Sequence, residues 1–91
     1  AARWARRKPE AAARLDAAKA GLAELSQQVS VPAENLLTPE IVRRLCWDWQ
    51  PMADVASAVE EFLVEAGARP WQRGLTVPVL TVALTRSAAE D

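Results

Sequence analysis

The stretch that decides the fold is residues 9–29, which read PEAAARLDAAKAGLAELSQQV. Its apolar residues recur at spacings of three and four, which places them on one stripe of an amphipathic helix. The members of this stripe are Ala11, Leu15, Ala18, Leu22, Leu25 and Val29. Pro9 suits the first turn of a helix, where its missing N–H group costs no hydrogen bond. The sequence therefore predicts a long helix over 9–29 that buries this stripe.

A second helix is predicted from Pro39 to Trp47. Pro32 and its polar neighbours end the first helix in a short loop, and Leu36 and Leu37 then enter the core. Thr38 is suited to cap the next helix, because its hydroxyl can accept a hydrogen bond from a first-turn N–H group. Proline at the first position and an acid in the first turn complete this start signal.

A third helix is expected after a connector over 48–53. Asp54 can cap it, and Gly67 supplies a stop. The side chains expected to face inward are Val55, Val59, Phe62, Leu63 and Ala66, and those expected to face outward are Glu60, Glu61 and Glu65.

The C-terminal segment allows more than one interpretation. Pro70 can open a short helix carrying Trp71, and a last helix can follow Thr76. Pro78 fits the first turn of that last helix and would kink a continuous one. A strand is the alternative, because many residues of 76–85 are β-branched. We favour helices, because a lone strand would have no partner for its backbone groups.

Composition and length support a single all-α domain. The chain has 91 residues, 51% of them hydrophobic and only three of them glycine, and its common residues are strong helix formers. We expect a compact bundle of four to five helices over 9–86, a linker or frayed helix start over 1–8, and a tail over 87–91. Because the sequence opens with Ala1 and not with Met, we interpret it as a piece of a larger protein.

Charge and cysteine content restrict the expected cellular location and exclude some kinds of site. The net charge is -1, and six of the eleven Lys and Arg residues lie within the first nineteen positions. A transit peptide is the alternative explanation of the basic start, although Glu10 and Asp16 interrupt it. Cys46, the single cysteine, cannot form an intrachain disulfide, and the absence of histidine excludes a Cys/His zinc site. We expect a cytoplasmic domain without a membrane span, with Cys46 as a core residue.

Catalytic chemistry is not expected on this chain. Without histidine, neither a Ser/His nor a Cys/His nucleophile pair can form. The three glycines are isolated and make no phosphate-binding loop. Glu60, Glu61 and Glu65 spread over one helix face, so we interpret them as solvated acids and not as metal ligands. We expect no cofactor in this domain.

A binding surface is the remaining candidate. At 100° per residue, Arg43, Arg44 and Trp47 share one side of the second helix. Two cations beside an aromatic ring suit single-stranded nucleic acid, although Trp47 packing into the core with ordinary surface arginines is the alternative. Arg69 and Arg73 are further candidate contacts around Trp71, for which a core position is the favoured role.

Two stretches resemble the C-terminal region of bacterial ribonuclease D, especially the actinobacterial kind. They are NLLTPEIVRRLCW over 35–47 and GARPWQ over 67–72, and the resemblance extends over residues 4–84. It implies an HRDC-type helical bundle, a domain also found in RecQ-like helicases, with an accessory role in handling nucleic acid. It also implies a parent whose separate N-terminal domain, with four acids and two divalent metal ions, trims the 3′ ends of structured RNA such as tRNA precursors.

We therefore expect an accessory domain, monomeric in isolation, that binds RNA weakly and positions it for the attached exonuclease. The alternative is a docking module that packs on the exonuclease or on a sister HRDC domain. It predicts an exposed apolar patch formed by Val77, Val79, Val82 and Trp71. A protein–protein adaptor unrelated to RNA is a third reading.

Overall fold

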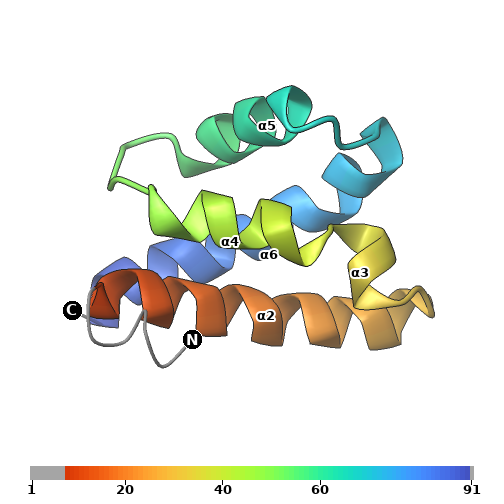
Figure 1. Ribbon diagram of the computed structural model, residues 1–91, viewed down its shortest axis with the longest axis horizontal. Helices are drawn as coiled ribbons and strands as arrows, with labels where there is room; N and C mark the ends of the chain where they lie inside the picture. The colour runs from red at the N-terminus through yellow and green to blue at the C-terminus, as the bar shows by residue number, and fades with distance from the viewer. Residues whose placement is uncertain (1–7, 91) are drawn as a thin grey trace.

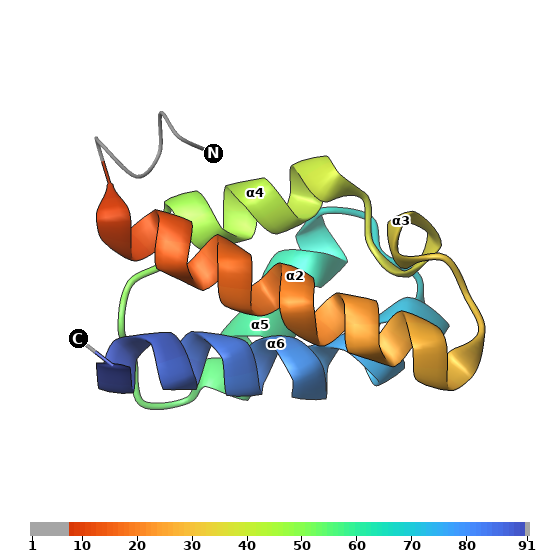
Figure 2. The ribbon, with the colours of Figure 1, turned by 90° about the horizontal axis from the view of Figure 1, so that it is seen from below.

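The protein is an all-helical bundle. The computed structural model describes residues 8–90, with side chains described as far as Arg86, so residues 1–7 of the expected linker and Asp91 lie outside the described residues. Within this part, five helices and no strand are formed: α2 (Pro9–Val29), α3 (Ala33–Leu36), α4 (Pro39–Trp47), α5 (Val55–Glu65) and α6 (Pro70–Glu90). Helices α2 and α5 lie on opposite sides, with α4 and α6 between them (Figure 1, Figure 2). The prediction of an all-α bundle of four to five helices is confirmed.

Helix α2 follows its apolar stripe. The predicted residues are buried, namely Ala11, Leu15, Ala18, Leu22 and Leu25, whereas Val29 is half-buried at the end of the helix. The helix ends at Ser30, which adopts the left-handed conformation with φ 57° and donates its N–H group to the Ser26 carbonyl. The Ser26 hydroxyl donates to the Val31 carbonyl at 2.6 Å. These bonds satisfy terminal carbonyls and turn the chain toward α3.

The predicted helix starts and the stop at Gly67 are confirmed. Thr38 Oγ1 accepts a hydrogen bond from Ile41 N at 3.4 Å at the start of α4, and Asp54 Oδ1 accepts one from Ser57 N at 3.1 Å at the start of α5. Gly67 has φ 90°, a conformation that side-chain-bearing residues rarely adopt. The short α3, which the sequence analysis assigned to a loop, carries Leu36 into the core.

Helix α6 corrects the prediction of two separate C-terminal helices. It is continuous from Pro70 to Glu90, with Pro78 inside it. Pro78 cannot donate a hydrogen bond to the carbonyl of Gly74, but both residues are exposed, so water can satisfy that carbonyl. On the opposite side, Thr76 and Leu80 are fully buried before and after the proline. Burial on both sides of the proline keeps the helix intact, and the strand alternative is wrong.

A single core cluster joins all five helices, among the described residues, and includes contributions from the connectors. Trp49 is 9% exposed and Ala68 is 7% exposed, although neither belongs to a helix. The burial of Trp49 was not predictable from sequence, because the connector over 48–53 shows no helical periodicity. Trp71, expected in the core, is 49% exposed, so that expectation is wrong.

Helices α2 and α6 share the most extensive contact among the described helix pairs of the bundle. They run antiparallel to each other in both views (Figure 1, Figure 2). At Gly21 the backbone of α2 approaches α6 so closely that an added Cβ atom would lie 2.7 Å from Val79 Cγ1. Gly74 provides the contrast, since a Cβ atom there would meet nothing within 4 Å.

The two helical glycines should respond oppositely to alanine. Gly21→Ala should lower the free energy of unfolding by about 1 kcal/mol, because overpacking against a stiff valine outweighs the gain in helix propensity. Gly74→Ala, the matched control, should raise it by about 0.5 to 1 kcal/mol. Urea unfolding followed by circular dichroism measures both. A stabilised Gly21→Ala protein would contradict the close approach of α2 and α6.

The cap of α5 should be visible in a pH titration. Hydrogen bonds from the Ser57 backbone and then from its hydroxyl lower the pKa of Asp54 below its usual 3.8. A depressed folded pKa means that this stabilisation is present above the unfolded pKa and is lost as pH falls through the folded value. Carboxyl NMR should place the Asp54 midpoint below 3.8, and Ser57→Ala should move it part of the way back. An unchanged midpoint in Ser57→Ala would exclude the hydroxyl contribution.

Candidate nucleic-acid interface

The three candidate residues of the second helix lie together on α4 and define what we call the α4 face: Arg43, Arg44 and Trp47. The opposite side of α4 buries Val42, Leu45 and Cys46. The arginines are exposed, and Trp47 is half-buried. The predicted partition of the helix into a buried side and a cationic, aromatic side is therefore observed.

The two guanidinium groups of the α4 face are not neutralised by carboxylates. Within the described part of the chain, the single ion pair joins Arg73 to Glu60 and does not involve α4. The Arg44 guanidinium carbon lies 5.8 Å from the centre of the half-buried Phe62 ring on α5, within the range of a cation–π contact. That contact keeps Arg44 beside α5 and leaves its hydrogen-bond donors available to an anion.

Trp47 is held in place by Lys8 from the start of α2. Lys8 Nζ lies 4.5 Å from the centre of the indole ring and donates a hydrogen bond to the Trp47 carbonyl at 3.0 Å. The ring is thus half-buried and in contact with a cation. It sits beside a third cation that the sequence analysis did not connect to α4.

A second cation from α2 binds the same end of α4. Arg14 Nε donates to the Cys46 carbonyl at 2.9 Å. Because the last carbonyls of a helix lack helical partners and carry partial negative charge, cations are favourable there. Lys8 and Arg14 together form what we call the C-terminal clamp of α4, which fixes the α4 face relative to α2.

Cys46 itself is an inert core thiol. Burial raises its pKa to about 11, and the positive charge of Arg14 opposes part of that rise. A thiol with this pKa is almost wholly protonated at neutral pH, and the thiolate is the reactive form. Its expected place in the core is confirmed.

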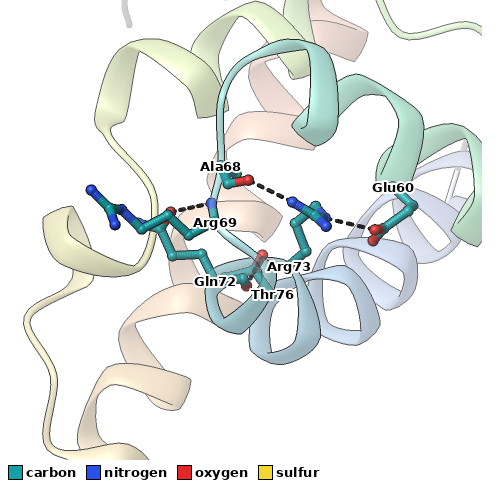
Figure 3. A network of polar contacts seen from close by, with 6 residues as sticks. All are labelled: Glu60, Ala68, Arg69, Gln72, Arg73 and Thr76. Carbon is teal, nitrogen blue, oxygen red and sulfur yellow. Dashed lines mark hydrogen bonds and ion pairs between the residues drawn. The ribbon is translucent and has the colours of Figure 1, made fainter.

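Arg73 is engaged inside the fold. Its Nε donates to Glu60 Oε1 at 2.6 Å and its Nη1 to the Ala68 carbonyl at 2.6 Å, and Figure 3 shows the guanidinium between these two partners. The pair joins α6 to α5 across the turn at Gly67. The charge of Arg73 is therefore balanced by Glu60, which makes it a weaker phosphate contact than an arginine without a carboxylate partner.

Arg69 and Trp71 lie at the start of α6, apart from the clamp. Both side chains are exposed, and Figure 3 shows the Arg69 guanidinium pointing away from Arg73. Gln72 Oε1 accepts from Arg69 N at 2.7 Å, and Gln72 Nε2 donates to the Asn35 carbonyl at 2.9 Å. Gln72 therefore caps α6 and ties it to α3.

Residues 8–90 form neither a metal-binding cluster nor a membrane-spanning helix. No group of three or more Cys, Asp or Glu side chains is arranged to hold a metal ion. No helix there combines the length and the apolar character that a membrane crossing requires.

The C-terminal clamp could not be predicted from sequence, because Arg14 and Cys46 are 32 positions apart and no local pattern links them. A weak signal existed for the contact between α2 and α6. Ala17 and Gly21 stand four positions apart, and small residues at that spacing permit close approach of another helix.

The described residues thus form a helical bundle that carries two exposed arginines and a half-buried tryptophan on α4. The chain belongs to the family described as the 3′ to 5′ exonuclease C-terminal domain, which it matches over residues 1–84. This finding supports the resemblance to an exonuclease accessory domain.

A solved structure is similar to the chain in sequence and in fold. The crystal structure of a protein from Bifidobacterium adolescentis matches with a TM-score of 0.77 and 31% sequence identity, over 90% of this chain. The match spans 19% of that protein's chain, so most of the relative lies outside the region compared. No curated protein matches the chain.

Removing the clamp should destabilise the bundle. Arg14→Met retains the apolar stem but leaves the Cys46 carbonyl without its donor, which should cost about 1 to 2 kcal/mol of unfolding free energy. Lys19→Met, which removes an exposed cation from the same helix, is the control and should change stability by less than about 0.5 kcal/mol. Urea titration separates the two outcomes, and equal effects would show that the clamp contributes nothing specific.

Proposed function

We propose that the chain is the C-terminal accessory domain of a longer, ribonuclease D-like 3′–5′ exoribonuclease, and that its α4 face contacts single-stranded RNA weakly. The catalytic acids, the divalent metal ions and the hydrolytic step are assigned to the rest of that cytoplasmic enzyme. The role of this domain is to position the RNA 3′ end, and by itself it acts as a monomer.

One observation carries the proposal. Arg43 and Arg44 present guanidinium groups to solvent, without a carboxylate partner among the described residues, on the helix face that also carries Trp47. Guanidinium groups bind phosphate through paired donors, and exposed indole surface can stack on an unpaired base. Lys8 adds a further positive charge next to the indole. Arg73 is left out because the Glu60 carboxylate balances its charge and its guanidinium is held between Glu60 and the Ala68 carbonyl, and Arg69 is a peripheral contact.

Docking onto another domain is the second candidate function. It is favoured by one specific observation, namely the exposure of Trp71 and Val82, which are 49% and 54% exposed on α6. Val77 and Val79, the other members of the patch expected for this function, are partly buried against the core. The exposed apolar surface is therefore narrower than expected.

The expected affinity is low and depends on salt. Contacts with three or four phosphates predict a slope of about -2 to -3 for the logarithm of the binding constant against the logarithm of salt concentration on single strands. Trp47 is already half-buried within the fold, so only part of its ring can stack on a base, and the stacking contribution to the binding free energy is small. Binding should therefore be measurable at low ionic strength and weak under cellular conditions.

An NMR titration tests the proposed RNA contact. A single-stranded oligouridylate at low salt should shift the amide signals of α4, and Arg43→Gln combined with Arg44→Gln should weaken binding and reduce the salt slope by about 1.4. Lys19→Gln, an exposed cation on α2, is the matched control and should bind nearly as the parent sequence does. Absence of α4 shifts at millimolar RNA, or equal loss in the control, contradicts the proposal.

A further inference from the structure

A groove runs between α2 and α6 on a side of the bundle that the proposed RNA contact does not use. Its volume is about 520 Å³. The floor and walls are formed mainly by small and apolar residues, namely Ala17, Ala20 and Gly21 of α2 and Pro78, Val79 and Val82 of α6. We refer to it as the α2–α6 groove.

The shape of the groove follows from the close approach at Gly21. Because Ala17, Ala20 and Gly21 have small side chains or none, α2 leaves a depression next to the row of larger α6 side chains, which we call the α6 ridge. Val82 stands on that ridge and is 54% exposed. Pro78 lies one turn before Val82 and is also exposed. A side chain from a partner helix could therefore pack against Val82 and over the small residues of α2.

Opposite charges stand at the two ends of the groove. Gly21 lies against Val79, and the helices run antiparallel, so Glu24 lies toward the C-terminal end of α2 while Arg86 lies toward its N-terminal end. Both side chains line the groove, both are exposed, and neither forms an ion pair within the described residues. The groove thus combines an apolar centre with one acid and one base available to a partner.

We propose that the α2–α6 groove binds one amphipathic helix from another domain of the same longer protein, with a base that meets Glu24 and an acid that meets Arg86. An acid is most favourable near a helix N-terminus and a base near the C-terminus. The occupant therefore runs parallel to α2 and antiparallel to α6. Its apolar stripe packs over Gly21 and against Val82.

The choice of occupant rests on the proposed function, in which this domain is one part of a longer exonuclease. In the Bifidobacterium relative the matching region makes up 19% of the chain, which leaves ample protein to supply a helix. Attachment to the same chain raises the effective concentration of the partner, so a narrow apolar contact of this kind suffices.

Thiol labelling tests the occupancy of the groove. Val82→Cys places a thiol on the exposed ridge, while the buried Cys46, with its pKa near 11, gives little background reaction with a maleimide. We expect position 82 to react about ten times more slowly in the longer native protein than in the 91-residue chain, because a docked helix covers it. Ala56→Cys, at an exposed position of α5, is the control and should react equally in both.

The charge pattern supplies an independent measurement. In the longer protein, Glu24→Lys should accelerate labelling at position 82, because it repels the partner's base. Glu34→Lys, a change of another exposed acid on α3, should not. Peptide mass spectrometry follows position 82 alone, whatever other cysteines the longer protein contains.

Two outcomes overturn the proposal. Equal labelling of position 82 in both proteins shows an open groove, and slow, concentration-dependent labelling in the 91-residue chain shows that a second copy is the occupant. The RNA titration reports on α4 in the 91-residue chain alone. Failure of RNA binding with protection of position 82 therefore rejects the RNA contact and leaves the docked helix standing.

Discussion

The close approach of α2 and α6 at Gly21 is the constraint on which the rest of the structure depends. An added Cβ atom at this position would lie 2.7 Å from Val79 Cγ1, so a larger residue fits there only if Val79 or one of the two long helices shifts. That spacing brings the stripe of α2 against the buried side of α6, where Leu80 and Leu84 complete the core. Helix α6 remains continuous across Pro78 because this packing continues on both sides of it. The same approach leaves a groove on the outer surface.

The two sides of α2 contact different helices. One flank meets α6, and the other supplies Lys8 and Arg14 to the C-terminal end of α4. These bonds place positive charge where a helix end is electrostatically negative, and they orient the indole of Trp47. The α4 face is consequently positioned by contacts with a 21-residue helix and its first residues, which suits a surface that must hold a ligand in a defined direction.

Much of the fold could be predicted because its signals are local. The stripe of α2, the Thr38 and Asp54 caps and the stop at Gly67 each depend on residues within a few positions. The continuity of α6 was not predictable by the same means, since Pro78 argues locally for a break and only tertiary burial overrides it. Trp71 illustrates the limit for side chains: an aromatic residue at the start of a helix favours burial on average, and the direction in which it points depends on the neighbouring helices. Of the candidate interface, the face on α4 was predictable from helical geometry, whereas the clamp and the engagement of Arg73 by Glu60 required the packed structure.

The antiparallel pairing of α2 and α6 also determines where other segments of a polypeptide can be connected to the domain. The first turn of α2 and the last turn of α6 lie at the same end of the bundle in both views (Figure 1, Figure 2). Neighbouring ends of this kind make a fold tolerant of circular permutation and of insertion into a host protein. A short linker from the end of α6 back to the start of α2, with new ends opened in the exposed residues 50–53, would preserve every helix and leave Trp49 in the core. The bundle is therefore a portable unit whose topology can be rewired without disturbing its core.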